Sequence, residues 1–466
     1  MLINPPAPHI LKNKSRRIPI GLLYLGAELK KYGHVVKLID INNDFLNLEQ
    51  KSQLNSKTYY SNFDLKIKVL NPDIVGITCQ FSGKFKALLE ISKRIKKINP
   101  NAPIVMGGIH SATFPKEILE QYDCIDYICL SEGENLIIDL INAHFNDKSS
   151  LTKIDGIAFR NGKKIIINPK RVFIKNLDEI PFPDYGIINL KDYYFDTSKW
   201  FNPKNLPINV NLPILSSRDC PNQCSFCANS IIWRRGWRAR SAKNVVDEIE
   251  FLYKKYNHRY FSFMDDNFTL SKQRVLDICK EILKRKLDIQ FDFPNGVSVK
   301  TLDKEVMDNL VKAGMVWLCV AIESGSEYIR NKVIKKNLPT KKIYDFFELA
   351  KNYKNLIIKA FFIIGFPQET KETLEETYMM IEKIKDSLDV LGIFYLTPYS
   401  GTEIFEYCQK NCLIKTTKKD LCNRDDYYFS DQGREGDKPF IKPFALEIKD
   451  LEEFREKVLK LVKRRI

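Results

Sequence analysis

One stretch of the chain, up to about residue 145, alternates short apolar runs with longer amphipathic segments. The runs VVKLIDI (35–41) and DIVGITCQ (73–80) are rich in β-branched residues, which is typical of buried parallel strands. IGLLYLGAELKKYG (20–33) and KALLEISKRIKKINP (86–100) instead repeat apolar residues at helical spacing. Repeated strand–helix–strand units predict an α/β domain with an open, doubly wound parallel sheet over residues 1–147.

The alternation of apolar runs and amphipathic segments resumes over residues 206–405, with about six repeats. About six strand-like runs, beginning with LPILSS (212–217) and YFSFM (260–264), are each followed by an amphipathic segment. Six strand–helix units favour a partial (β/α)6 barrel rather than a complete eightfold one. In parallel architectures of both kinds, ligands bind beyond the carboxyl ends of the strands.

The two remaining segments, 148–205 and 406–466, have the features of a connector and of a C-terminal extension. Asn161-Gly162 sits between two alternating runs and is a strong hairpin signal, and prolines punctuate the residues that follow. We therefore expect a hairpin and linker over residues 148–205. Residues 406–466 are expected to form a helical C-terminal extension, in which the polar, aromatic stretch 424–440 covers the barrel mouth as a possible substrate cover.

Composition places the chain among globular proteins. It is 44% hydrophobic and 28% charged, and its longest apolar run, LIIKAFFIIGF (356–366), is short and interrupted by Lys359. The N-terminal residues lack the charged-then-apolar order of a signal peptide. These features predict a cytoplasmic protein that does not act at a membrane.

The formal net charge of +16 is compatible with nucleic-acid binding. The lysines, however, are spread over nearly every predicted helix, as a general compositional bias would also produce. WRRGWRARSAK (233–243) is the one local cluster that stands out. It fits two interpretations equally: a site for an anionic group, and a solvated loop held by its two tryptophans.

Three of the eleven cysteines stand in a C-x3-C-x2-C pattern directly after a predicted strand: Cys220, Cys224 and Cys227. In a cytoplasmic protein, such spacing indicates metal binding rather than disulfides. Structural zinc usually takes four ligands, and the nearest histidine in sequence, His258, lies beyond a predicted helix. A [4Fe–4S] cluster held by three cysteines would keep one iron open. The other eight cysteines are expected to be buried: Cys79, Cys124, Cys129, Cys279, Cys319, Cys408, Cys412 and Cys422.

The cysteine run, with Phe226 before its third cysteine, resembles the cluster loop of radical S-adenosylmethionine (SAM) enzymes. FMDDNFT (263–269), GMVWLCVAIESGS (314–326) and IIGFPQET (363–370) follow in the order that this family uses. The resemblance implies that the cysteines hold a [4Fe–4S] cluster, on which SAM is cleaved to a 5′-deoxyadenosyl radical. It also implies SAM contacts from Phe226, Asp265, Asp266, Asn267, Glu323, Ser324, Gly365 and Pro367. The family's Gly-Gly-Glu is absent, so the resemblance does not select among residues 265–267.

The first domain resembles the Rossmann-like cobalamin-binding domain that precedes the barrel in one branch of this family. Its segments at 21–42, 74–80, 104–119 and 129–135 match in order. The implied cobalamin contacts are Thr78, Ser82, Gly107, Gly108, His110, Glu132 and Gly133. A D-x-H-x-x-G motif is missing, so we expect no histidine ligand to cobalt and a structural or tail-contacting role for His110. The alternative is a degenerate domain that no longer binds cobalamin.

Together, the two resemblances imply a cobalamin-dependent radical SAM methyltransferase that acts on an unactivated carbon or a phosphinate. Its partners would be a small-molecule or natural-product substrate and an electron donor such as flavodoxin or ferredoxin. Three alternatives stay open: a radical SAM cyclase or rearrangement enzyme with the same cofactors, a tRNA-modifying radical SAM enzyme, and a zinc-stabilised RNA-binding protein. The cysteines alone do not separate them.

Overall fold

A computed structural model describes residues 1–6, 17–50, 53, 55–194, 201–233, 236–423 and 438–462. The chain divides into two compact units. The first comprises Met1–Lys175, Glu179–Tyr194 and the segment that begins at Thr416, and the second comprises the remainder. The hairpin and the connector up to Tyr194 thus group with the first unit, apart from the short stretch Asn176–Asp178.

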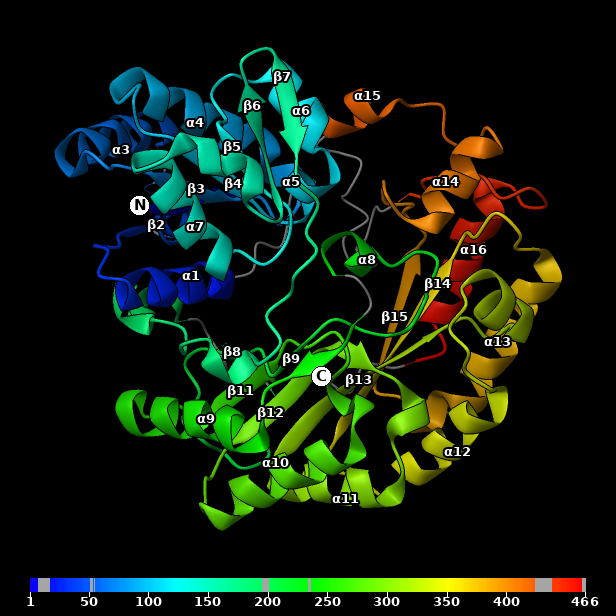
Figure 1. The fold of residues 1–466 in the computed structure, drawn as a ribbon. Helices are drawn as coiled ribbons and strands as arrows, with labels where there is room; N and C mark the ends of the chain where they lie inside the picture. Colours follow the sequence, from blue (N-terminus) through cyan, green and yellow to red (C-terminus); the bar gives the residue numbers. More distant parts are fainter. Residues whose placement is uncertain are drawn as a thin grey trace. The chain divides into compact units, whose positions relative to one another are not determined.

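The first unit is built on a seven-stranded sheet of order β2-β1-β3-β4-β5-β6-β7 (Figure 1). Its strands are β1 (Leu2–Asn4), β2 (Leu38–Asp40), β3 (Val75–Thr78), β4 (Ile104–Gly107), β5 (Tyr127–Cys129), β6 (Ile157–Asn161) and β7 (Lys164–Ile167). The first five pair in parallel, which confirms the predicted doubly wound sheet. β6 and β7 extend it antiparallel as the expected hairpin, whose turn includes Gly162 at a φ of 60°.

Helices flank this sheet. They are α1 (Ile20–Lys31), α2 (Ile41–Gln50), α3 (Ser56–Leu70), α4 (Phe85–Ile98), α5 (Ile109–Thr113), α6 (Pro115–Gln121) and α7 (Glu134–Phe145). α15 (Lys418–Asn423), far along the chain, also joins this unit by packing on α6. The side chain of Asn423 donates to Oε1 of Gln121 at 3.0 Å and accepts from the hydroxyl of Tyr122.

The second unit contains a six-stranded parallel sheet of order β15-β14-β13-β12-β11-β8, a partial barrel as predicted. Its strands are β8 (Leu212–Ile214), β11 (Tyr260–Phe263), β12 (Gln290–Val297), β13 (Met315–Glu323), β14 (Ile357–Ile364) and β15 (Val390–Tyr395). Its helices are α8 (Asn229–Ile232), α9 (Ala242–Tyr256), α10 (Lys272–Lys284), α11 (Lys304–Ala313), α12 (Thr340–Ala350), α13 (Lys371–Ile384), α14 (Glu403–Lys410) and α16 (Ile448–Leu459). A short antiparallel ladder joins β9 (Ser217–Arg218) to β10 (Arg238–Ala239).

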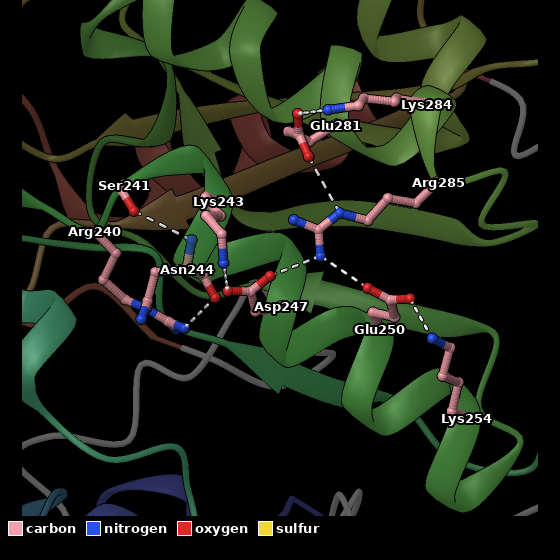
Figure 2. A network of polar contacts seen from close by, with 10 residues as sticks. All are labelled: Arg240, Ser241, Lys243, Asn244, Asp247, Glu250, Lys254, Glu281, Lys284 and Arg285. Atoms are coloured by element: carbon pink, nitrogen blue, oxygen red, sulfur yellow. Dashed lines mark hydrogen bonds and ion pairs between the residues drawn. The ribbon is translucent and has the colours of Figure 1, made fainter.

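A polar network fixes two of the outer barrel helices to each other (Figure 2). The Arg285 guanidinium, just after α10, lies 2.7 Å from Asp247 and 2.8 Å from Glu250, both on α9. It also reaches Glu281 on its own helix at 3.2 Å. Because one partly buried guanidinium bonds to three carboxylates, it fixes the position of α10 relative to α9. The strand ends that these helices connect are positioned with them.

Most of the scattered cysteines are small buried side chains, as predicted. Cys79, Cys129, Cys279, Cys319, Cys408 and Cys422 are buried, and Cys124 is half-buried. Cys412 is exposed, so the prediction is wrong there. It lies in the turn after α14 at a φ of 58°, where the chain leaves the helix.

Two further expectations, on membrane spans and on the cover of the barrel mouth, concern segments that the structure describes only in part. Within the described ranges, every helix is too short or too polar to cross a lipid bilayer. Of the stretch 424–440, which we expected to cover the barrel mouth, residues 424–437 lie outside the part of the chain that the structure describes.

Candidate functional site

A cavity of about 390 Å³ lies at the carboxyl ends of the barrel strands. The predicted site residues on its wall are Cys220, Cys224, Phe226, Cys227, Asp266, Asn267 and Glu323. Asn222, Asn229, Ser230, Asn295, Gly296, Val297, Ser298, Ala321 and Lys336 complete the wall. The cysteine loop, the turn after β11 and the carboxyl ends of β12 and β13 therefore meet at one cavity, as the rule for parallel strands predicts.

The cysteine loop begins at a residue with left-handed backbone. Asp219 has a φ of 74°, a conformation that residues other than glycine adopt only at a cost. Its carboxylate accepts the backbone N–H of Cys220 at 2.6 Å and the N–H of Gly236. Further along, Ser225 donates its N–H to Ile334 and its hydroxyl to Val333, each at 2.9 Å. These bonds fix both ends of the turn that carries the thiols.

Burial dominates the acidity of the loop thiols. It raises the pKa of Cys224 to about 11 and that of Cys227 to about 12. The neighbouring Cys220 adds to both shifts, because two thiolates placed close together repel. Three neighbouring soft sulfur donors fit a thiolate-bound [4Fe–4S] cluster, whose iron would favour the charged form. Across the part of the chain that the structure describes, no three His, Cys, Asp or Glu side chains stand in metal-binding geometry.

A buried ion pair lies beside the thiols. The Lys336 ammonium is 2.7 Å from Oε1 of Glu323, and both side chains are less than a tenth exposed. Burial opposes the ammonium charge, but the Glu323 carboxylate, with Cys224 and Cys220, outweighs it and raises the pKa of Lys336. Glu323 itself ends β13 at a φ of 71°. Two opposite charges held in a polar cavity can each exchange their partner for a charged group of a ligand.

The three polar residues after β11 have separate roles. Asp265 is buried away from the cavity wall and accepts hydrogen bonds from Ser216, whose N–H and hydroxyl lie at 3.2 and 2.7 Å, and from the Ser217 hydroxyl. It therefore anchors the entry to the cysteine loop. Asp266 and Asn267 do line the cavity. Burial raises the pKa of Asp266 to about 6, so part of its population is protonated near neutral pH.

Ser324, Gly365 and Pro367 lie outside the cavity wall. Ser324 is fully buried and accepts the N–H of Ser326 at 3.2 Å. Gly365 has a φ of 94° and donates its N–H to the buried carboxylate of Glu369. Pro367 accepts the N–H of Phe444 at 3.0 Å. Ser324 therefore belongs to the turn after β13, and Gly365 and Pro367 to the turn after β14, both outside the cavity wall.

Aromatic packing connects that turn to the cavity. The ring of Phe366, which lies between Gly365 and Pro367, is 6.4 Å from the ring of Phe226 in an edge-on arrangement. Phe226 stands on the cavity wall and precedes the third cysteine. The turn therefore supports the Phe226 ring on the cavity wall through this contact.

In the first unit, the residues predicted to contact cobalamin lie at or after the ends of β3, β4 and β5. Gly108 has a φ of 111°, and a Cβ added there would lie 2.6 Å from the carbonyl oxygen of Cys79. Only glycine allows the two backbones to cross so closely. Thr78, Gly107 and Gly108 remain partly accessible at the strand ends, next to the exposed Phe81. An accessible edge of backbone and apolar surface fits a large planar ligand such as cobalamin.

The remaining side chains on this rim are buried. His110, only 1% exposed, accepts or donates one bond from Nδ1 to the Ser82 hydroxyl at 2.7 Å. The rings of Phe85 and Phe114 lie 4.4 and 5.1 Å from its imidazole, and burial lowers its pKa to about 3. Glu132 accepts the N–H of Ile174 at 2.9 Å. Gly133 lies against Leu25, where a Cβ would come within 3.0 Å of Cδ2.

Comparison with known proteins matches a family model to each of the two units. The model of the B12 binding domain matches residues 10–141, and that of the Radical SAM superfamily matches residues 214–381. The chain is 32% identical over 418 residues to the "uncharacterized methyltransferase PH0819" of Pyrococcus horikoshii, covering 89% of this chain and 84% of that protein. The chain belongs to the cobalamin-dependent radical SAM enzymes.

Other relatives of this cobalamin-dependent radical SAM enzyme carry related names. It is 27% identical to the cytidylyl-2-hydroxyethylphosphonate methyltransferase of Streptomyces wedmorensis, over 88% of this chain and 81% of that one. The solved structure of the radical SAM methyltransferase TsrM from Kitasatospora setae, with cobalamin and a [4Fe–4S] cluster, shares its fold. That alignment has a TM-score of 0.66 at 18% identity and covers 90% of this chain and 76% of TsrM.

The family fixes the cofactors of this enzyme: a [4Fe–4S] cluster, SAM and cobalamin. Sequence reasoning missed Lys336 on the cavity wall. Its signal was weak, a pair of lysines after Glu323 in a segment with no strand or helix pattern of its own. The structure brings Lys336 inward because Lys335 and Asn337 on either side adopt φ values of 65° and 53°.

Proposed function

We propose that this enzyme is a methyltransferase that acts on an unactivated carbon or a phosphinate of a small-molecule or natural-product substrate. The observation that carries the proposal is the 32% identity to a protein named as a methyltransferase over nearly the whole chain. The phosphonate methyltransferase relative supports it further. When bound, the cluster and SAM supply a 5′-deoxyadenosyl radical, and cobalamin supplies the methyl group.

In this proposal, Cys220, Cys224 and Cys227 hold the cluster. The Lys336 ammonium binds the SAM carboxylate, and Glu323 accepts hydrogen bonds from SAM amino or hydroxyl groups. The 2.7 Å pair that they now form supports this role, because two buried charges that neutralise each other can be transferred to a zwitterionic ligand at little electrostatic cost.

Two other wall residues, Phe226 and Asp266, orient SAM. Phe226 offers its backbone and a ring backed by Phe366 to the adenine side. Asp266, whose pKa is about 6, offers a carboxyl group that accepts or donates a hydrogen bond near neutral pH. We also propose an acidic one-electron donor such as flavodoxin or ferredoxin, which the net charge of +16 would attract.

A second candidate function is cyclisation with the same cofactors. The chain is 29% identical to the anaerobic magnesium-protoporphyrin IX monomethyl ester cyclase of Cereibacter sphaeroides and covers 64% of that protein. A cyclase needs the radical but transfers no methyl group. The two functions therefore differ in what becomes of SAM.

The deciding experiment measures both SAM products from the full chain, reconstituted anaerobically with iron, sulfide and hydroxocobalamin, under reducing conditions. A methyltransferase yields S-adenosylhomocysteine together with 5′-deoxyadenosine, and trideuteromethyl-SAM labels the cobalamin. A cyclase yields 5′-deoxyadenosine alone. If S-adenosylhomocysteine does not exceed the level formed without cobalamin, the proposal of methyl transfer is wrong.

A further inference from the structure

The side-chain amide of Asn267 lies against a cysteine sulfur. Its Nδ2 is 3.4 Å from Sγ of Cys220, within hydrogen-bonding distance for sulfur. The side chain is 4% exposed, and its Oδ1 has no hydrogen-bond partner among the described residues. The amide is thus oriented with its donor toward the sulfur. The reverse orientation would place an amide oxygen against a thiolate, where the two negative atoms repel.

A tryptophan from the basic segment holds Asn267 in place. Nε1 of Trp237 donates to the backbone carbonyl of Asn267 at 3.1 Å. The indole in turn lies under the guanidinium of Arg274, 5.9 Å from the ring centre. The β9–β10 ladder places Trp237 here, because it pairs Arg238 with Arg218 just before the cysteine loop.

Two further residues of this segment also bond to the protein near the cysteine loop. Arg240 is buried and forms an ion pair with Glu248, and its backbone N–H bonds to Ser216 at 2.9 Å. Gly236 donates to Asp219 at the start of the cysteine loop. The described part of 233–243 therefore serves as a clamp on the cysteine loop and on Asn267.

We propose that Asn267 is a positioning residue that donates a hydrogen bond to the Cys220 sulfur and raises the reduction potential of the bound cluster. Trp237 keeps the amide in register. A donor to a ligand sulfur stabilises the extra negative charge of the reduced cluster, and hydrogen bonds to the sulfurs are among the groups that set such potentials. The inference rests on the proposed assignment of Cys220 as a cluster ligand.

The test is a redox titration of the reconstituted full chain, followed by electron paramagnetic resonance. Asn267→Leu keeps the side-chain volume and removes the donor. We expect the ratio of reduced to oxidised cluster at a fixed potential to fall roughly tenfold, equivalent to a lowering of about 59 mV for a one-electron couple. Trp237→Phe, which removes the indole N–H together with the five-membered part of the ring and keeps one aromatic ring, should shift the potential in the same direction by less.

Asn295→Leu is the matched control. Asn295 lines the same cavity, but its amide donates to the backbone oxygen of Met264 at 2.8 Å. This variant should leave the potential unchanged. A second readout is the coupling of an exchangeable deuteron to the reduced cluster in D₂O, which the native chain should show and Asn267→Leu should lose.

The outcomes separate the two claims. A full iron content in Asn267→Leu with an unchanged potential and deuteron coupling overturns the role of Asn267. If Asn267→Leu takes up no cluster, Trp237→Phe decides: an unchanged potential overturns the proposal, and a lowered one supports it. If Cys220→Ala keeps the native iron content and spectrum, the ligand assignment fails, and the proposal for Asn267 fails with it.

Discussion

The carboxyl edges of the two parallel sheets offer different surfaces to a ligand. Around the barrel cavity, thiols, a carboxylate and an ammonium group reach the wall, among them Cys220, Glu323 and Lys336. On the rim of the first unit, Ser82, His110 and Glu132 are buried and bonded to the protein itself, and glycine backbone is left accessible. One edge presents charged groups and thiols on a cavity wall, and the other presents accessible backbone over buried polar side chains.

Similar local sequence patterns thus produce different surfaces. Both edges lie where parallel strands end, and both carry polar residues in sequence, although the strand orders differ. What separates them is whether the polar side chains reach a cavity wall, as Glu323 and Lys336 do, or are buried beneath the edge, as His110 is. Polar side chains buried beneath an edge shape its surface, whereas those on a cavity wall can meet a ligand.

The largest expected effect tests the separation of the two sites. Cys224→Ala removes a proposed cluster ligand, so the reconstituted chain should lose the [4Fe–4S] signal and all 5′-deoxyadenosine formation. Cobalamin retention, which depends on the first unit, should stay as in the native chain. Iron analysis, paramagnetic resonance and the cobalamin absorption spectrum report the two properties independently. A retained cluster would contradict the assignment.

The next effect tests the charge pair. Lys336→Met should weaken SAM binding roughly 10- to 100-fold, since a charged hydrogen bond is lost. It should also lower the free energy of unfolding by about 3 kcal/mol, because Glu323 is left buried and unpaired. Equilibrium binding and denaturant titration measure the two effects.

Lys335→Met is the control for that variant, one residue away. Lys335 is 44% exposed and pairs with Glu403 at the surface. Exposed pairs contribute at most about 1 kcal/mol, and SAM affinity should not change. Equal effects of the two variants would show that Lys336 has no special role.

A third prediction concerns the backbone crossing in the first unit. Gly108→Ala should cost about 3 kcal/mol and release cobalamin, because the new Cβ meets the Cys79 carbonyl at 2.6 Å in a backbone conformation that alanine disfavours. Gly107→Ala, where the nearest atom is 3.8 Å away, should cost less than about 1 kcal/mol. Denaturation of the apoprotein and cobalamin retention provide the readouts.

The smallest effect is a dependence of stability on pH. The pKa of His110 is about 3 in the folded chain and about 6.5 unfolded, so the unfolded state binds the proton first as pH falls. Between pH 6.5 and pH 5 this should remove about 2 kcal/mol of stability. His110→Gln should flatten the curve over that window. A constant His110 imidazole resonance from pH 8 to pH 5 would support the same assignment.

The sequence predicted both sheets, because the spacing of apolar residues shows which segments are buried strands and which are amphipathic helices. It also grouped the residues that line the barrel cavity. It did not distinguish Asp265 from Asp266, since neighbours in a turn look alike until their partners are known. Asp265 is occupied by Ser216 and Ser217, which lie about fifty positions earlier in the chain.

Lys336 was missed for a related reason. Its inward direction depends on left-handed backbone at Lys335 and Asn337, which residue identity does not reveal. Neither the Asn267–Cys220 contact nor the clamp of Trp237 has a sequence signal, because both depend on how the β9–β10 ladder folds back. The residue pattern thus predicted which loops form the site, whereas the contacts in the folded chain distinguish the individual side chains.

The return of α15 to the first unit has a consequence for synthesis on the ribosome. Gln121 and Tyr122 find their partner in Asn423, about three hundred residues later. The N-terminal unit therefore emerges first but reaches its final form only after the whole barrel has been translated. A nascent chain arrested before residue 418 would carry this unit with the α6 surface that α15 covers exposed, and a truncation that removes α15 would weaken the first unit as well as the second.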